Sequence, residues 1–88
     1  MLLGTPNTSA ETLERLSYDE NCGTITNVAY NPNTPIESLV RLANNEYWEV
    51  RANVAINPNT PKETINLLLS DNREEVREAA SYRINNKT

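Results

Sequence analysis

The chain has 88 residues, a formal net charge of −4, 38% hydrophobic residues and 23% charged residues, which fits one small folded domain. Its lysines and arginines are scattered, so it has no global attraction to nucleic acid or to an anionic membrane. It contains no histidine, two glycines and one cysteine, which argues against a histidine-based active site, a glycine-rich phosphate loop and an internal disulfide.

The single cysteine, Cys22, and the lack of a recognisable secretory signal predict a cytoplasmic protein. Residues 1–3 are apolar but too few for the hydrophobic part of a signal peptide. No apolar run approaches the roughly 20 residues that a membrane helix needs, so we expect no membrane association.

A turn motif, Asn-Pro-Asn-Thr-Pro at residues 31–35, returns complete at residues 57–61, which is 26 residues later, and a weaker copy lies at residues 5–9. A fixed period in this range is typical of a repeat array, in which each unit buries its apolar face against its neighbours. We therefore expect a single repeat domain, with units at residues 5–30, 31–56 and 57–82 and end caps at 1–4 and 83–88.

Each unit is expected to open with a capping box, in which a threonine hydroxyl accepts from a first-turn amide and a glutamate reaches back to the cap. Pro35 and Pro61 fit the first helical position, where the missing N–H costs nothing. The prolines of each motif also predict that the preceding helix stops near Asn31 and Asn57. The predicted capping pairs are Thr8 with Glu11, Thr34 with Glu37, and Thr60 with Glu63.

The first helix of each unit should run for roughly ten residues, because Ile36, Leu39 and Leu42 follow helical spacing. A polar connection follows, and then a shorter second helix with Val50 and Val54 on one face. The connections are predicted at residues 18–23, 44–49 and 70–75.

The two ends of the array need covering. Residues 1–3 can shield the first unit, and Tyr82 and Ile84 can shield the third. Three units are close to the minimum for a stable array, so pairing with a second copy through an end face, as a homodimer, stays open.

Segments 31–43, 50–55 and 57–58 alternate Asn-Pro turns with Leu-x-x-Leu-Ala and Val-Arg-x-x-Val-Ala, and they resemble the leucine-rich repeat variant family of bacteria. The resemblance implies an all-α fold: a right-handed α-solenoid, or superhelix, of three helix-pair repeats in which some helices are 3-10. HEAT repeats are the neighbouring alternative, since Asp71 and the Val76-Arg77 pair look like their signature, but HEAT units have about 40 residues.

One known member type of that family holds an iron–sulfur cluster on several cysteines. Cys22 alone cannot supply such a cluster, so we expect no cofactor. The loop carboxylates also lack the spacing and the glycine of a calcium loop, so no metal site is expected.

Tyr47 and Trp48 are the sharpest candidates for a binding role, because two large aromatic residues stand together in a predicted loop. The alternative, that one ring folds down over the gap between two units, stays open for Trp48 in particular. Acidic residues surround this pair and fill the other two loops. The predicted partner-binding residues are Asp19, Glu20, Glu46, Tyr47, Trp48, Glu49, Glu74 and Glu75.

Arg51 and Arg77 permit two interpretations. Each can reach the loop before its own helix, Arg51 to Asn45 and Arg77 to Asp71, which would tie the two helices of a unit together. This interpretation is favoured. The alternative is a basic stripe for an anionic ligand, for which Arg15, Arg41, Arg51 and Arg77 would have to converge.

These patterns predict a non-catalytic protein–protein interaction module that uses an acidic loop edge with aromatic anchors. The expected partner is a protein with a basic surface, since carboxylates select lysine and arginine. The alternatives are a nucleic-acid-binding helical repeat, against which the acidic balance argues, and an acidic inhibitor that mimics nucleic acid. An enzyme is not expected.

Overall fold

The structure is a computed structural model, and it describes residues 8–85. In this range the chain forms six α-helices and no strand. The helices are α1 (Ala10–Leu16), α2 (Cys22–Tyr30), α3 (Ile36–Leu42), α4 (Trp48–Ile56), α5 (Lys62–Leu68) and α6 (Glu74–Asn85). All six are α-helical, so the expectation that some helices are 3-10 is wrong for this part of the chain.

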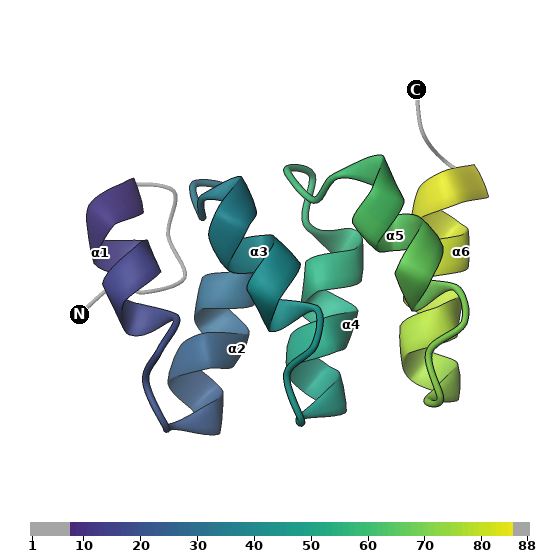
Figure 1. Cartoon of the computed structure of the whole chain (residues 1–88), viewed down its shortest axis with the longest axis horizontal. Helices are drawn as coiled ribbons and strands as arrows, with labels where there is room; N and C mark the ends of the chain where they lie inside the picture. The colour runs from purple at the N-terminus through teal and green to yellow at the C-terminus, as the bar shows by residue number, and fades with distance from the viewer. Residues whose placement is uncertain (1–7, 86–88) are drawn as a thin grey trace.

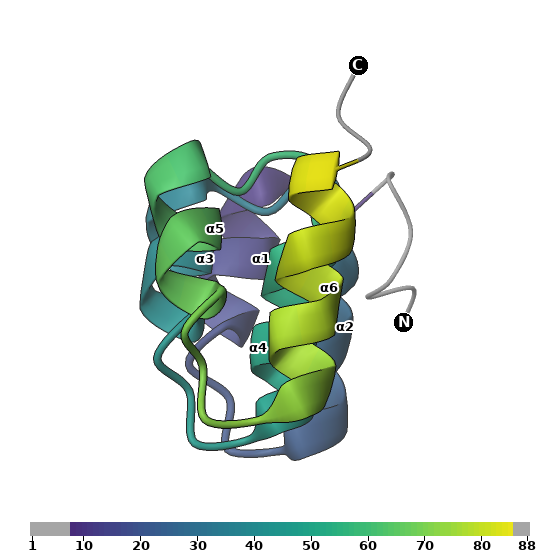
Figure 2. The ribbon, with the colours of Figure 1, turned by 90° about the vertical axis from the view of Figure 1, so that its right-hand side faces the viewer.

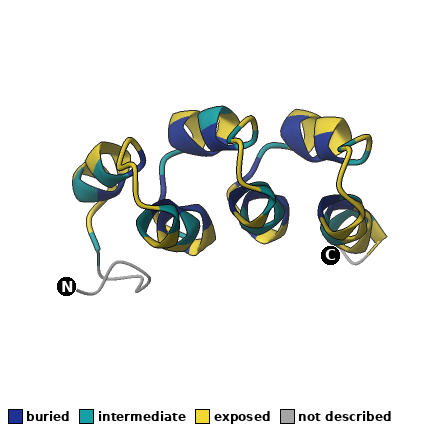
Figure 3. Cartoon of the chain, turned by 90° about the horizontal axis from the view of Figure 1, so that it is seen from below, coloured by how far each residue is buried: buried dark blue, intermediate teal, exposed yellow. Residues whose placement is uncertain are grey.

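The helices lie in two layers, with α1, α3 and α5 in one and α2, α4 and α6 in the other (Figures 2 and 3). Within the second layer α4 lies between α2 and α6 and packs against both (Figure 1). The connections α1–α2, α3–α4 and α5–α6 follow one edge of the molecule, and the connections α2–α3 and α4–α5 follow the opposite edge (Figure 1).

Proline sets where the second-layer helices end. Asn31 and Asn57, each followed by proline, have extended backbone with ψ of 128°, so α2 stops at Tyr30 and α4 at Ile56. In α6 the position equivalent to these prolines is occupied by Ile84, which permits helical geometry. Helix α6 therefore continues to Asn85 and has 12 residues, whereas α2 and α4 have nine each.

The first-layer helices are shorter than the sequence predicted, and the second-layer helices are longer. Helices α1, α3 and α5 have seven residues each, because the residue before each helix, Ser9, Pro35 or Pro61, is extended, with ψ of 153°, 149° and 152°. The second-layer helices begin at Cys22, Trp48 and Glu74, inside the segments expected to be loops.

The capping boxes predicted for the three units do not form. Pro35 and Pro61 occupy the cap positions and no side chain caps α3 or α5, while Ser9, not Thr8, caps α1 by accepting from Thr12 N at 3.2 Å. The physical reason is that each helix begins one residue later than expected. The predictions for Thr8 with Glu11, Thr34 with Glu37, and Thr60 with Glu63 are therefore wrong.

The two turn threonines repair a defect that proline creates. Pro32 has no N–H for the carbonyl of Val28 four residues earlier, and the Thr34 hydroxyl donates to that carbonyl instead, at 2.5 Å. Thr60 donates to the Val54 carbonyl in the same way, at 2.6 Å. Both threonines are buried, so these bonds satisfy groups that water cannot reach.

The core runs between the two layers. Leu39 and Leu42 are buried as the spacing predicted, but Ile36 is 52% exposed and lies outside the core. Near the end of the described residues Ile84 packs on the core, whereas Tyr82 is 66% exposed and is not part of the core. The cap predicted at residues 1–3 lies outside the described residues. The largest buried apolar side chains are Leu13, Ile25, Val28, Leu39, Leu42, Val50, Val54, Ile65, Leu68 and Val76.

Candidate protein-binding edge

The three connections along one edge share a turn. The third residue of each connection accepts, through Oδ1, from the backbone amide two residues later, which fixes the loop and starts the next helix. The bonds are Asn21 N to Asp19 at 2.7 Å, Tyr47 N to Asn45 at 2.9 Å and Arg73 N to Asp71 at 2.9 Å.

Exposed carboxylates gather along these connections. Glu75 differs from the others because it forms an ion pair, in which Arg73 Nε donates to its Oε1 at 2.8 Å. A hydrogen bond from its own backbone amide, and then the Arg73 guanidinium, lower the pKa of Glu75. We call the exposed set the acidic loop edge. Its members are Asp19, Glu20, Glu46, Tyr47, Glu49 and Glu74.

Tyr47 and Trp48 have different environments. Tyr47 directly precedes α4 and is 38% exposed. Trp48 is the first residue of α4 and is half-buried against the core, and the Arg73 guanidinium covers its ring at 4.5 Å from the centroid. Trp48 is therefore packed, and Tyr47 is the more accessible of the two.

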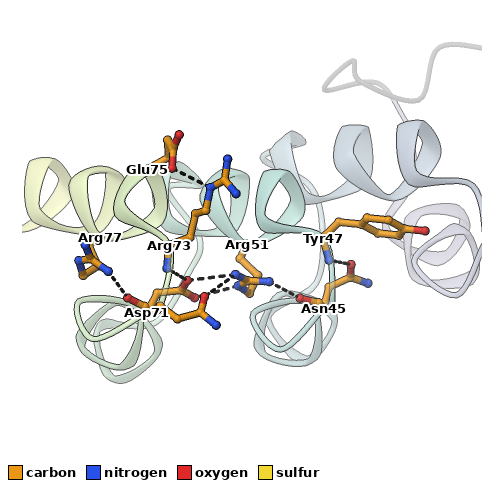
Figure 4. Close-up of polar contacts among 8 residues, drawn as sticks. Asn45, Tyr47, Arg51, Asp71, Arg73, Glu75 and Arg77 are labelled. Carbon is orange, nitrogen blue, oxygen red and sulfur yellow. Dashed lines mark hydrogen bonds and ion pairs between the residues drawn. The ribbon is translucent and has the colours of Figure 1, made fainter.

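Arg51 lies at the centre of a polar network (Figure 4). Its Nη1 donates to the Asn45 carbonyl at 2.8 Å, the contact expected from the sequence. Its Nε and Nη2 donate to the two carboxylate oxygens of Asp71 at 2.8 and 3.0 Å, a forked pair that joins two helix pairs. That hydrogen bonding lowers the pKa of Asp71 and raises the pKa of Arg51.

Arg77 makes the other contact expected from the sequence, since its Nη1 donates to the Asp71 carbonyl at 2.7 Å. Arg41 donates to Ser17 Oγ at 2.8 Å and stacks on the Tyr18 ring, 3.8 Å from its centroid. Three of the four arginines that a phosphate-binding stripe would need are thus held by the chain's own groups. Only Arg15 has neither kind of contact among the described residues.

Sequence reasoning missed the buried asparagines of the turn motif. Asn57 is 1% exposed, and its Nδ2 donates to the carbonyls of Ala29 and Asn31, both at 2.8 Å. The 26-residue separation between Asn31 and Asn57 was visible in the sequence, but the role of the amide was not. Arg83 stands a further 26 residues on and donates to the carbonyls of Asn57 and Pro58 in its place.

Sequence reasoning also missed Tyr18, which is 66% exposed in the α1–α2 connection next to Asp19.

Cys22 is half-buried, with its Sγ 3.7 Å from Thr26 Oγ1. Among residues 8–85, no three Cys, Asp or Glu side chains are arranged so that they could hold a metal ion. None of the helices in the described range has the length and apolar character needed to cross a membrane.

No family model, curated protein or solved structure matches this chain.

Proposed function

We propose that the chain is a non-catalytic protein-interaction module that binds a basic segment of another protein through the acidic loop edge. One observation carries this proposal. Three loops lie along one edge (Figure 1), and the carboxylates and the Tyr47 ring on that edge are exposed and lie outside the core. Carboxylates spaced along an edge favour lysine and arginine, and an exposed tyrosine supplies contact area at low entropic cost.

The proposed scaffold is a right-handed α-solenoid of three 26-residue helix pairs, like that of the leucine-rich repeat variant family. Its support is the recurrence of the same bonds in successive turns. Thr34 to Val28 and Thr60 to Val54 both span six residues, and Asn57 reaches back by 26 residues to Asn31. A bacterial cytoplasmic origin belongs to the same proposal.

Trp48 has a supporting role in this proposal. Its ring is half-buried under Arg73, so it holds the start of α4 rather than presenting a free surface. Tyr47 is fixed by the bond from its amide to Asn45 Oδ1, so its ring is presented from a rigid backbone. Preorganisation of this kind reduces the entropy lost on binding.

The test is binding to a library of fluorescent peptides that contain two to four lysines or arginines, measured by anisotropy at low salt. We expect some basic peptides to bind and Tyr47→Ala to weaken the tightest of them about tenfold, since an anchor residue contributes about 1.4 kcal/mol or more. Added salt should weaken binding further.

Tyr30→Ala is the matched control. Tyr30 is exposed, at 56%, but it ends α2 at the opposite edge of the molecule (Figure 1), so its loss should leave peptide binding unchanged. The proposal fails if no basic peptide binds, or if both tyrosine variants weaken binding equally while circular dichroism shows native helicity.

The same assay decides the two alternatives. A labelled single-stranded or duplex oligonucleotide in place of the peptide tests nucleic-acid binding, which must fall steeply with salt. An inhibitor that mimics nucleic acid would bind basic peptides, and an unlabelled oligonucleotide would compete for the peptide rather than for this chain.

A further inference from the structure

The network along the loop edge ends on Arg77, which donates through Nη1 alone among the described residues. Arg51 donates to the loop of its own helix pair through Nη1, and to Asp71 of the next helix pair through Nε and Nη2. Arg77 repeats the first contact alone, on the Asp71 carbonyl. Figure 4 shows Arg77 at the end of the row, on the far side of Asp71 from Arg51. No carboxylate of residues 8–85 forms an ion pair with it.

The first helix pair carries the complementary half. Asp19 stands in the α1–α2 connection where Asp71 stands in the α5–α6 connection, and both accept the same bond from the amide two residues on, at 2.7 and 2.9 Å. The carboxylate of Asp19 is thus held as that of Asp71 is. Asp19 is exposed, and no arginine of the described residues reaches it.

The residues between these two ends follow the same rule. Arg51 is followed in the next loop by Asp71. Ile25, which stands at the arginine position of the first pair, is followed in the next loop by neutral Asn45. Each interior junction is therefore matched, charged with charged or neutral with neutral. The unmatched charges are Arg77 at one end and Asp19 at the other.

We propose that copies of this chain associate head to tail, with α1 and α2 of one copy stacked on α5 and α6 of another. In this arrangement the free Nε and Nη2 of Arg77 fork onto Asp19 of the next copy as Arg51 forks onto Asp71. The last helix pair also has an open pocket of about 150 Å³, lined by Thr60, Lys62, Ile65, Arg83 and Ile84, which offers apolar contact on the same pair.

Head-to-tail contact joins two different surfaces, so it leaves one free surface at each end of the assembly. The number of chains per assembly should therefore rise with protein concentration. The test is sedimentation velocity at low salt over a concentration series up to about 1 mM, a range that detects weak association. The mass should rise above the 9.9 kDa of the single chain. Asp19→Asn should weaken association about tenfold, because a charged partner is lost.

Asp19→Asn keeps the loop intact, since Asn45 makes the same turn. Glu20→Gln removes one negative charge from the neighbouring residue and should associate as the wild-type chain does. The proposal is overturned if the wild-type chain stays at 9.9 kDa throughout, or if Asp19→Asn and Glu20→Gln associate equally.

A mixing experiment tests direction. Asp19→Arg keeps the Arg77 end and Arg77→Asp keeps the Asp19 end, so each variant alone should be monomeric. An equimolar mixture should associate again, because every junction between unlike variants pairs opposite charges, the original pair at one junction and the exchanged pair at the next. Association of either variant alone as strongly as the wild-type chain contradicts the proposal. If Arg77→Asp does not fold, the comparison of Asp19→Asn with Glu20→Gln decides the question.

Discussion

Asp71 joins three residues of the loop edge through its side chain and its backbone. Its carboxylate accepts from Arg51 and from the backbone amide of Arg73, and its carbonyl accepts from Arg77. Both side chains of the forked pair are largely buried, with 13% of Arg51 and 9% of Asp71 exposed. Breaking such a pair leaves an uncompensated charge away from water, which costs more than losing a surface ion pair.

Asp71→Asn should therefore destabilise the chain by about 2–3 kcal/mol, because asparagine keeps the turn but loses the charge that neutralises Arg51. Urea denaturation followed by circular dichroism measures the change. Asp19→Asn removes the same charge from the same turn where no arginine is bound, and it should cost less than about 0.5 kcal/mol. Equal losses for the two variants would show that the forked pair adds no stability.

The same pair predicts a pH dependence. Hydrogen bonding to Arg51 lowers the pKa of Asp71 below its usual 3.8, so the folded state holds the ionised form more strongly than the unfolded state does. This stabilisation is present above the unfolded pKa and is lost as the pH falls through the folded pKa. The stability difference between wild type and Asp71→Asn should thus shrink below about pH 4.

At the scale of the helices, proline decides both ends of each turn. Pro32 and Pro58 stop α2 and α4, and they also lack the N–H that would donate to the carbonyls of Val28 and Val54 four residues earlier. The hydroxyl of the following threonine donates to each carbonyl instead. Proline and threonine are therefore one device, although they are separated by an intervening asparagine.

Thr60→Val tests this device, because valine keeps the shape and removes the donor to the Val54 carbonyl. We expect a loss of about 1 kcal/mol in the free energy of unfolding, the net value of one hydrogen bond, because the Val54 carbonyl still accepts from the Asn57 amide at 3.2 Å. Thr60→Ser keeps the hydroxyl and should lose less than Thr60→Val. A smaller loss for valine than for serine, in thermal or urea denaturation, would mean that the methyl group matters more than the bond.

The positions and the helical nature of the elements could be predicted from the 26-residue period and from the spacing of Leu39, Leu42, Val50 and Val54. The starting residues could not. Proline fits both the cap position and the first helical position, so sequence alone does not separate the two. The threonine hydroxyl likewise serves as cap acceptor or as donor to the previous helix, and only the distance to the Val28 carbonyl decides.

At the scale of the whole molecule, each helix pair is covered by its neighbours through one continuous core. Leu39 in α3 is fully buried, while Leu67 in α5 is 75% exposed. Helix α4 lies between α2 and α6, so the central pair contacts both outer pairs. Each pair alone would leave one apolar side uncovered, and we expect the six helices to unfold as one unit.

Leu39→Ala should cost about 3 kcal/mol, a large part of the stability of a domain this small. Far-UV circular dichroism and Trp48 fluorescence should report one coincident transition in the variant and in the wild type. Leu67→Ala, which removes an equal volume from the surface, should change stability by less than about 0.5 kcal/mol. Separate transitions by the two probes would show that the helix pairs unfold independently.

The candidate site was predictable at the level of loops and only partly at the level of residues. Gathering the acidic connections at one edge follows from the repeat, and so do the short contacts of Arg51 with Asn45 and Arg77 with Asp71. The fork from Arg51 to Asp71 crosses between helix pairs, and its geometry depends on how the pairs are stacked. Whether Trp48 is packed depended on Arg73, a contact between different loops.

The asparagine amides point backwards along the chain: Asn57 satisfies carbonyls of the preceding turn, and Arg83 does so at the end. A duplicated block placed between existing turns would bring its own amide for the block before it and leave its own carbonyls to the block after it. Lengthening by internal duplication thus preserves the buried bonds from the asparagine amide to the carbonyls of the preceding turn. Addition after Arg83 and Ile84 does not, because the arginine and the continuing helix replace the asparagine–proline junction that a further block would need.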